Sequence, residues 1–216
     1  MGDVIRLSER RAALRPRRPA GLRSRSRAEF FFDLACPFTY LAAERIERAF
    51  DEVAWRPAFA DALRRSSLAR DAFGAASVRR AAEERAAALR LPLVWPERFP
   101  AEVPAAMRVA GYAAEAGRGA AFVLAATRLA FCGGFDLDDP EILAEAAAAA
   151  GVVLEDTLHA ARYEGRDGAI ASAGRALLAA GADQLPALRV GRGLYWGEDR
   201  ISQALLAARV ARVAGG

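Results

Sequence analysis

The sequence has few of the residues on which metal and phosphate chemistry depends. Its 216 residues include two cysteines and one histidine, which are not spaced as metal ligands are. It contains no glycine-rich phosphate-binding loop, and no run of 18 apolar residues that could cross a membrane. These absences argue against a metal site, a phosphate-binding loop and a membrane-spanning protein.

An apolar stretch of signal-peptide length is also missing near the N-terminus. We therefore expect a cytoplasmic chain, in a compartment where thiols stay reduced. Lysine is absent too, so arginine supplies all 31 positive charges. A chain of this length predicts one domain, or one domain with an insertion.

Residues 1–27 differ in charge from the rest of the chain. Nine arginines stand there against Asp3 and Glu9, a net charge of +7, whereas the whole chain carries +4. This segment has no apolar face, so we expect a disordered, solvated, arginine-rich tail. Binding to nucleic acid or another acidic surface is the alternative that its charge leaves open.

The stretch from Phe30 to Leu41 carries the clearest local signals. The apolar run from Phe30 to Leu34 predicts a central strand, and apolar residues at helical spacing predict a helix over 38–50. Pro37 occupies the first helical position, where its missing N–H costs nothing. Cys36 is therefore predicted at a strand-to-helix turn, just before the first turn of the helix.

This position favours the ionised form of the Cys36 thiol. The first backbone N–H groups of a helix have no partners inside it, and the helix macrodipole adds partial positive charge there. Cysteines at such positions have pKa values below the ordinary value of about 8.5. Cys36 is thus a candidate nucleophile or redox centre, and a small buried apolar residue is the alternative.

The rest of the chain predicts strands at both ends and helices between them. Residues 53–57 predict a second strand, parallel to the first because a helix connects them. Residues 61–164 carry helical signals, with an irregular proline-rich connector at 91–100. A helix near 170–181 then precedes two short strands joined by a turn, and Asp199 is placed to cap a last helix. The predicted helices within and after the insertion cover 77–90, 104–116, 119–132, 140–150, 154–162 and 200–213, and the two late strands cover 187–190 and 194–196.

Two motifs, about 150 residues apart, resemble a known family. The first is Cys-Pro-Phe-Thr-Tyr-Leu at 36–41, and the second is Leu185-Pro186 followed by Trp-Gly-Glu-Asp-Arg-Ile at 196–201. Together they resemble the DsbA-like branch of the thioredoxin superfamily. Within it, the chain is most similar to 2-hydroxychromene-2-carboxylate isomerases and kappa-class glutathione transferases, over roughly residues 29–212.

This resemblance implies an α/β protein with a thioredoxin-like fold and an all-helical insertion. The thioredoxin-like domain would comprise residues 28–60 and 165–216, and the insertion residues 61–164. Pro186 would follow a cis peptide bond and face the thiol, and the backbone of Leu185 would pair with an extended thiol substrate. Glu198 and Asp199 would contact the γ-glutamyl end of glutathione.

The resemblance also implies a thiol-dependent enzyme, either an oxidoreductase or an isomerase, with a small aromatic or disulfide substrate. Disulfide oxidoreductases of the family carry a second cysteine where this chain has Thr39, so Cys36 is expected to act as a single thiol. Glutathione is the expected cofactor. A lysine that contacts glutathione in the family is missing, which leaves an equivalent low-molecular-weight thiol open. A homodimer is also compatible with the resemblance.

Two other functions stay open from the sequence. Cys36 could itself turn over in a monothiol disulfide reductase or a peroxide-reactive protein, or the chain could be a catalytically silent thioredoxin-fold binding module. Cys132 is predicted to be a buried structural thiol, with resolution of a Cys36 sulfenic acid as the alternative. His159, on a short polar helix, is predicted at the surface.

Overall fold

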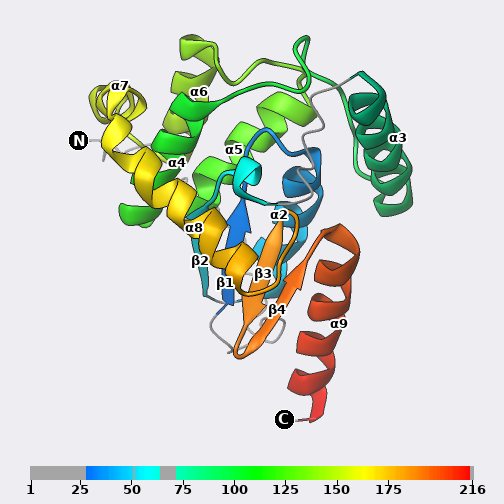
Figure 1. Ribbon diagram of the computed structural model, residues 1–216. Helices are drawn as coiled ribbons and strands as arrows, with labels where there is room; N and C mark the ends of the chain where they lie inside the picture. The colour runs from blue at the N-terminus through cyan, green and yellow to red at the C-terminus, as the bar shows by residue number, and fades with distance from the viewer. Residues whose placement is uncertain (1–27, 51, 64–71, 215–216) are drawn as a thin grey trace, which may run out of the picture.

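The computed structural model describes residues 28–50, 52–63 and 72–214 (Figure 1). The predicted arginine-rich tail over residues 1–27 lies outside the described residues. The elements that form the strand-rich part, in chain order, are β1 (Ala28–Phe32), α2 (Pro37–Ala49), β2 (Val53–Pro57), the 3₁₀ turn η1 (Ala60–Ala62), α8 (Asp167–Ala179), β3 (Ala187–Val190), β4 (Gly193–Trp196) and α9 (Glu198–Ala214).

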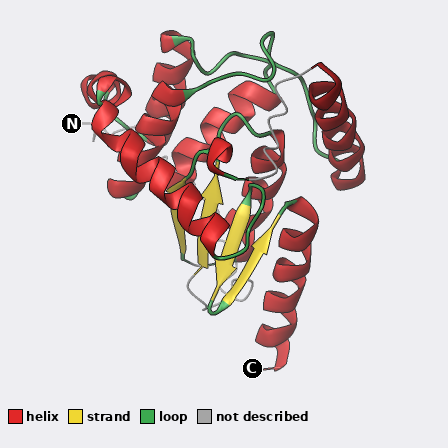
Figure 2. Ribbon diagram, in the orientation of Figure 1, coloured by secondary structure: helices red, strands yellow, loops and turns green. Residues whose placement is uncertain are grey.

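The helices between η1 and α8 occupy the middle of the chain. They surround the upper part of the sheet in Figure 2, where the strands are drawn in yellow. In the described part of the chain, no helix combines the length and apolar character that a membrane span requires. These middle elements are α3 (Ala72–Leu89), α4 (Pro104–Glu115), α5 (Gly119–Phe131), α6 (Pro140–Ala150), α7 (Leu154–Arg162) and the 3₁₀ turn η2 (Glu164–Arg166).

The described strands form one mixed sheet in the order β2-β1-β3-β4. β1 and β2 pair in parallel, with Phe30 opposite Trp55, whereas β1 and β3 pair in antiparallel, with Phe30 opposite Leu188. β4 returns antiparallel to β3 through a turn in which Gly191 has a φ of +56°. The predicted parallel strand–helix–strand unit and the predicted hairpin are both confirmed.

Alternate residues of β1 point to opposite faces of the sheet and enter two different cores. Phe30 and Phe32 belong to the larger core, which the sheet shares with α2, α9 and the middle helices. Phe31 points to the other face and packs in a smaller core with Leu177 of α8 and Leu185. In Figure 1, α8 accordingly crosses in front of the sheet and α2 lies behind it.

Most predicted elements agree with the structure, and several begin earlier than predicted, among them β1, which covers Ala28–Phe32 rather than 30–34. α3 starts at Ala72 and α8 at Asp167. α9 starts at Glu198 rather than at Arg200, so Asp199 lies inside the first turn and does not cap the helix. Asp139 is the N-cap of α6, because its side chain accepts a hydrogen bond from the Glu141 N–H at 2.8 Å. The α/β fold with helices inserted between β2 and β3 is confirmed, and the exact domain boundaries stay a prediction.

Gly174 lets α8 approach the loop that follows β2. A Cβ atom at this position would lie 2.7 Å from the Ala62 Cβ and 2.8 Å from the Phe59 carbonyl oxygen. Contacts this short, one of them to a backbone atom, would force α8 away from η1 if residue 174 carried a Cβ atom. Gly168, in the same helix, has no heavy atom within 4 Å of such a Cβ.

We therefore expect Gly174→Ala to lower the free energy of unfolding by roughly 1–3 kcal/mol, as overpacked sites generally do. Gly168→Ala is the matched control, because it adds the same methyl group in open space and changes stability by less than about 1 kcal/mol. Urea unfolding followed by circular dichroism measures both changes. Equal effects of the two substitutions would contradict close packing at Gly174.

Candidate active site

Cys36 is the N-cap of α2, between the end of β1 and Pro37. Its backbone is extended, with φ −87° and ψ 118°, and Pro37 opens the helix. The Cys36 N–H donates to the Asp33 carbonyl at 3.1 Å, and the Thr39 N–H donates to the Cys36 carbonyl at 3.0 Å. The turn is therefore held by its own backbone, and the thiol stands at the N-terminus of a 13-residue helix.

The structure brings the thiol next to a segment 149 residues later in the chain. The Cys36 Sγ lies 3.9 Å from the Leu185 carbonyl oxygen, and the Leu185–Pro186 peptide bond is cis, as the resemblance implies. Cys36, Leu185 and Pro186 are all buried, and Cys36 has no solvent-exposed surface. A substrate or reagent must therefore displace some of the residues that cover Cys36 before it reaches the sulfur.

A groove of about 840 Å³ runs beside this contact and collects three of the predicted site residues. Leu185, Glu198 and Asp199 line it, together with Phe38 of α2 and Arg85 of α3. The turn from β4 into α9 is tied to the cis-proline segment, since the Gly197 N–H donates to the Pro186 carbonyl at 2.9 Å. The remaining residues along the groove are Ala81, Glu84, Asp183, Gln184, Trp196, Gly197, Arg200 and Gln203.

The two acidic residues of the groove have different surroundings. Glu198 is buried, and its carboxylate is hydrogen-bonded and ion-paired to both Arg45 of α2 and Arg85 of α3. Ser202 completes the cluster by accepting from both arginines, at 2.9 and 2.7 Å. Asp199 is exposed and makes no hydrogen bond or ion pair with the described residues. Glu198 therefore joins α2, α3 and α9, whereas Asp199 is the acid in the groove that a ligand can reach.

Asp33 is a site residue that the sequence reasoning did not single out. It is buried at the end of β1, and its two carboxylate oxygens accept hydrogen bonds from the N–H groups of Ala35 and Ala60, both at 3.0 Å. Burial raises the pKa of Asp33 from 3.8 to about 6, against the opposite effect of the two hydrogen bonds. An acidic residue at the end of a strand, three positions before the cysteine, was the available signal.

Asp33 also lines a second cavity, of about 570 Å³. Ala35 lies at this cavity, as do Met107 of α4, Phe59 and Pro100. The lining is largely apolar, and its volume suits a small organic molecule. The cavity thus borders Asp33 and Ala35, just before Cys36, whereas the groove borders Phe38, just after it.

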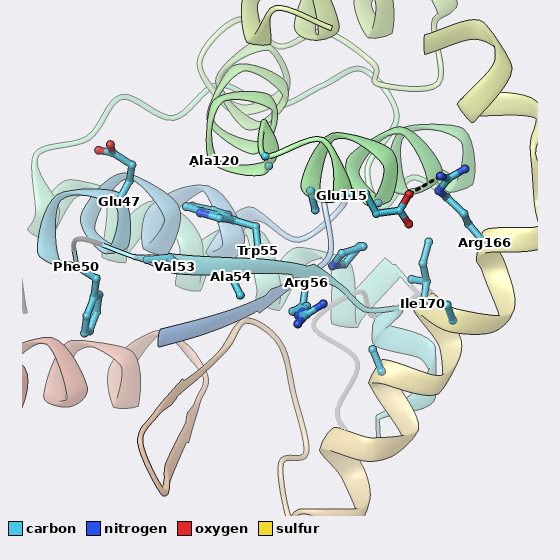
Figure 3. Close-up of a pocket in the computed structure, with 17 residues that line it drawn as sticks. Glu47, Phe50, Val53, Ala54, Trp55, Arg56, Glu115, Ala120, Arg166 and Ile170 are labelled. Carbon is cyan, nitrogen blue, oxygen red and sulfur yellow. Dashed lines mark hydrogen bonds and ion pairs between the residues drawn. The ribbon is translucent and has the colours of Figure 1, made fainter. Parts of the chain in front are cut away.

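A third cavity, of about 550 Å³, follows the outer edge of β2 and lies apart from the residues that surround Cys36 (Figure 3). Trp55 and Arg56 line it, and Arg166 at one end is ion-paired with Glu115 at 2.6 Å. Phe50 and Glu47 lie near its other end.

The second cysteine and the histidine have local partners of their own. Cys132 is partly buried, and its thiol lies 3.0 Å from the hydroxyl of Tyr40, which donates to the Pro92 carbonyl at 2.9 Å. Burial and the contact with Cys132 raise the pKa of Tyr40 above its ordinary value, so the phenol stays protonated. His159 is exposed and stacks on Tyr163, with a centroid distance of 6.2 Å, which confirms the predicted surface position.

Comparison with known proteins places this arrangement in context. The model of the DSBA-like thioredoxin domain matches residues 27–208. The comparison with curated proteins finds no significant match.

Several solved structures share the fold. One is 2-hydroxychromene-2-carboxylate isomerase, with 20% identity, a TM-score of 0.71 and coverage of 88% of this chain and 98% of that one. A probable DsbA oxidoreductase from Streptomyces coelicolor has 24% identity, a TM-score of 0.65 and coverage of 85% and 89%. A putative protein disulfide isomerase from Nitrosomonas europaea has 17% identity, a TM-score of 0.63 and coverage of 87% and 98%.

The raised pKa of Asp33 predicts a pH-dependent stability. Because the folded-state pKa, about 6, exceeds the ordinary value of 3.8, protonation of Asp33 favours the folded state. This contribution is complete below pH 4 and is lost as the pH rises through 6. Between pH 7 and pH 4, the free energy of unfolding of the wild type should rise by roughly 3 kcal/mol relative to Asp33→Asn.

Urea unfolding of the wild type and of Asp33→Asn at several pH values measures this difference. Asp139→Asn is the control, because it replaces an exposed carboxylate with another good N-cap residue. Parallel pH profiles of the wild type and Asp33→Asn would show that Asp33 has an ordinary pKa.

Proposed function

Because this chain belongs to the DSBA-like thioredoxin domain family, we propose that it is a thiol-dependent oxidoreductase or isomerase with Cys36 as its single working thiol. The observation that carries this proposal is the position of the Cys36 Sγ at a helix N-terminus, 3.9 Å from the Leu185 carbonyl oxygen. Three elements, β1, α2 and the segment before β3, converge there on one sulfur atom.

A single-thiol chemistry follows from the residue at the third helical position. Thr39 stands three residues after Cys36, so the first turn of α2 has no second sulfur with which to form a disulfide. The other cysteine of the chain, Cys132, is hydrogen-bonded to the Tyr40 hydroxyl. Cys36 would therefore act with a thiol from solution, either by forming a mixed disulfide with it or by stabilising it as a bound thiolate.

The cofactor we propose is glutathione or an equivalent low-molecular-weight thiol, held in the groove beside Leu185. Asp199 offers an exposed carboxylate to a cationic amine, and neighbouring Arg200 offers a cation to a carboxylate. This pair suits the zwitterionic end of a γ-glutamyl compound. Glu198 would hold Arg45 and Arg85 in place beside the groove and would not itself bind the cofactor, since its carboxylate is already paired with both arginines.

An isomerase of this type uses its thiol cofactor to add reversibly to an unsaturated bond, which permits rotation before the thiol leaves. The residues of this chain would position the reactants and stabilise the sulfur charge. The apolar cavity beside Asp33 and Ala35 is the place that we propose for the small aromatic substrate. For a disulfide substrate, the Leu185 backbone would guide an extended chain past Cys36.

The first test is the pH dependence of Cys36 alkylation in a Cys132→Ala variant, with and without glutathione. The helix N-terminus predicts a midpoint below about 8.5, and a bound cofactor predicts a slower reaction with glutathione present. The midpoint reports ionisation even though the buried thiol reacts only after local opening. A midpoint at 8.5 or above without protection would show that Cys36 is a structural thiol.

Asp199 provides a second test, directed at the cofactor. Asp199→Asn removes the charge from the exposed acid of the groove, so the glutathione concentration needed for half-protection should rise about tenfold. Glu141→Gln removes a charge from an exposed residue of α6 and serves as the control. Protection that is equal in both variants would remove Asp199 from the cofactor site, and a low midpoint without protection would indicate direct thiol redox chemistry.

A further inference from the structure

We propose that the hydroxyl of Thr39 donates a hydrogen bond to the thiolate of Cys36 and thereby stabilises the reactive form of the enzyme. This inference rests on the proposed function of Cys36 as the working thiol. It assigns a role to the residue that stands where the dithiol members of the family have their second cysteine.

The first observation is a buried hydroxyl whose hydrogen-bonding capacity is unused. Thr39 has no exposed surface, and its Oγ1 has no hydrogen-bond partner among the described residues. Buried polar groups in native proteins are nearly always paired, and an orphan requires an explanation. Thr39 therefore keeps a donor in the interior that the resting structure does not use.

Comparison with the other buried helical threonines shows why Thr39 is different. Thr127 and Thr157 donate to the carbonyl oxygens four residues earlier, those of Val123 and Val153, at 2.7 and 2.9 Å. Thr39 is the third residue of its helix, so the residue four positions earlier, Ala35, precedes the helix. The Ala35 carbonyl lies outside the helix, and the Thr39 hydroxyl does not donate to it.

The second observation is the relation between Thr39 and Cys36 within the first turn. In a capping box, the side chain of the third helical residue reaches back to the N-cap residue, which here is Cys36. The Cys36 N–H already donates to the Asp33 carbonyl, so it does not need the Thr39 oxygen as an acceptor. What Thr39 can still provide toward Cys36 is its O–H.

Ionisation of Cys36 creates the acceptor that this O–H requires. The resting thiol is directed at the Leu185 carbonyl, which can only accept hydrogen bonds. When the S–H bond breaks and the proton leaves to solvent, the sulfur keeps the electron pair and becomes an acceptor itself. The Thr39 O–H then turns toward the sulfur, and its own O–H bond stays intact.

The test compares Thr39→Val with Thr39→Ser in the Cys132→Ala background. Valine has the shape of threonine without the hydroxyl, whereas serine keeps the hydroxyl. We expect Thr39→Val to raise the midpoint of Cys36 alkylation by about one pH unit, which means a tenfold smaller ionisation constant of the thiol. Thr39→Ser should leave the midpoint within a few tenths of a unit of the parent.

The thermal midpoint gives an independent readout. A purely structural threonine would lose stability in the valine variant, whereas removal of an orphan hydroxyl should leave the melting temperature unchanged or raise it. Thr39→Ala replaces Thr39→Val if the valine variant does not fold.

The possible outcomes separate this inference from the proposed function. A parent midpoint below 8.5 that does not move in Thr39→Val overturns the role of Thr39 and leaves Cys36 as the working thiol. A parent midpoint at or above 8.5, without protection by glutathione, overturns the proposed function itself. A rise of the midpoint in Thr39→Val that Thr39→Ser does not share supports the hydrogen bond.

Discussion

The antiparallel pairing of β1 with β3 is the constraint on which the rest of the site depends. β1 leads directly into the turn of Cys36, and β3 directly follows Leu185 and Pro186. The register that places Phe31 opposite Ala187 therefore also sets the thiol against the Leu185 carbonyl. A slip by one residue would turn the side chains of β3 to the other face of the sheet, so both cores oppose it. The precision of the site thus comes from the sheet.

Local signals in the sequence predicted most elements because each signal acts within a few residues. Pro37 marks the start of α2, Asp139 caps α6, and the strand over 53–57 has the predicted bounds. The contact between Cys36 and Leu185 is different, because nothing in the residues themselves states which strands pair. The family resemblance was the source of that expectation, and the role of these residues in catalysis stays a prediction.

Asp33 and Glu198 show what local signals could not predict. The pKa of Asp33 depends on burial and on the Ala60 N–H, 27 residues away, which no nearby pattern reveals. Glu198 was expected to contact an amine of the cofactor, but Arg45 and Arg85 reach its carboxylate from distant helices. A buried acid with two partly buried partners is costly to disturb, because the loss of one partner leaves a buried charge less well compensated. Glu198 therefore fixes the positions of Arg45 and Arg85 at the groove, and Asp199 remains the exposed acid.

The sequence separation between the thiol and its cover also matters while the chain is being made. Cys36 leaves the ribosome 149 residues before Leu185. At synthesis rates of 5–20 residues per second, this interval lasts roughly 7–30 s. During that time β3 is not yet made, so the Cys36 thiol, which is buried in the folded protein, is not covered by the Leu185 segment. The Cys36 thiol of a newly made chain is consequently accessible to oxidants and disulfides until the segment that contains Leu185 and β3 folds against it.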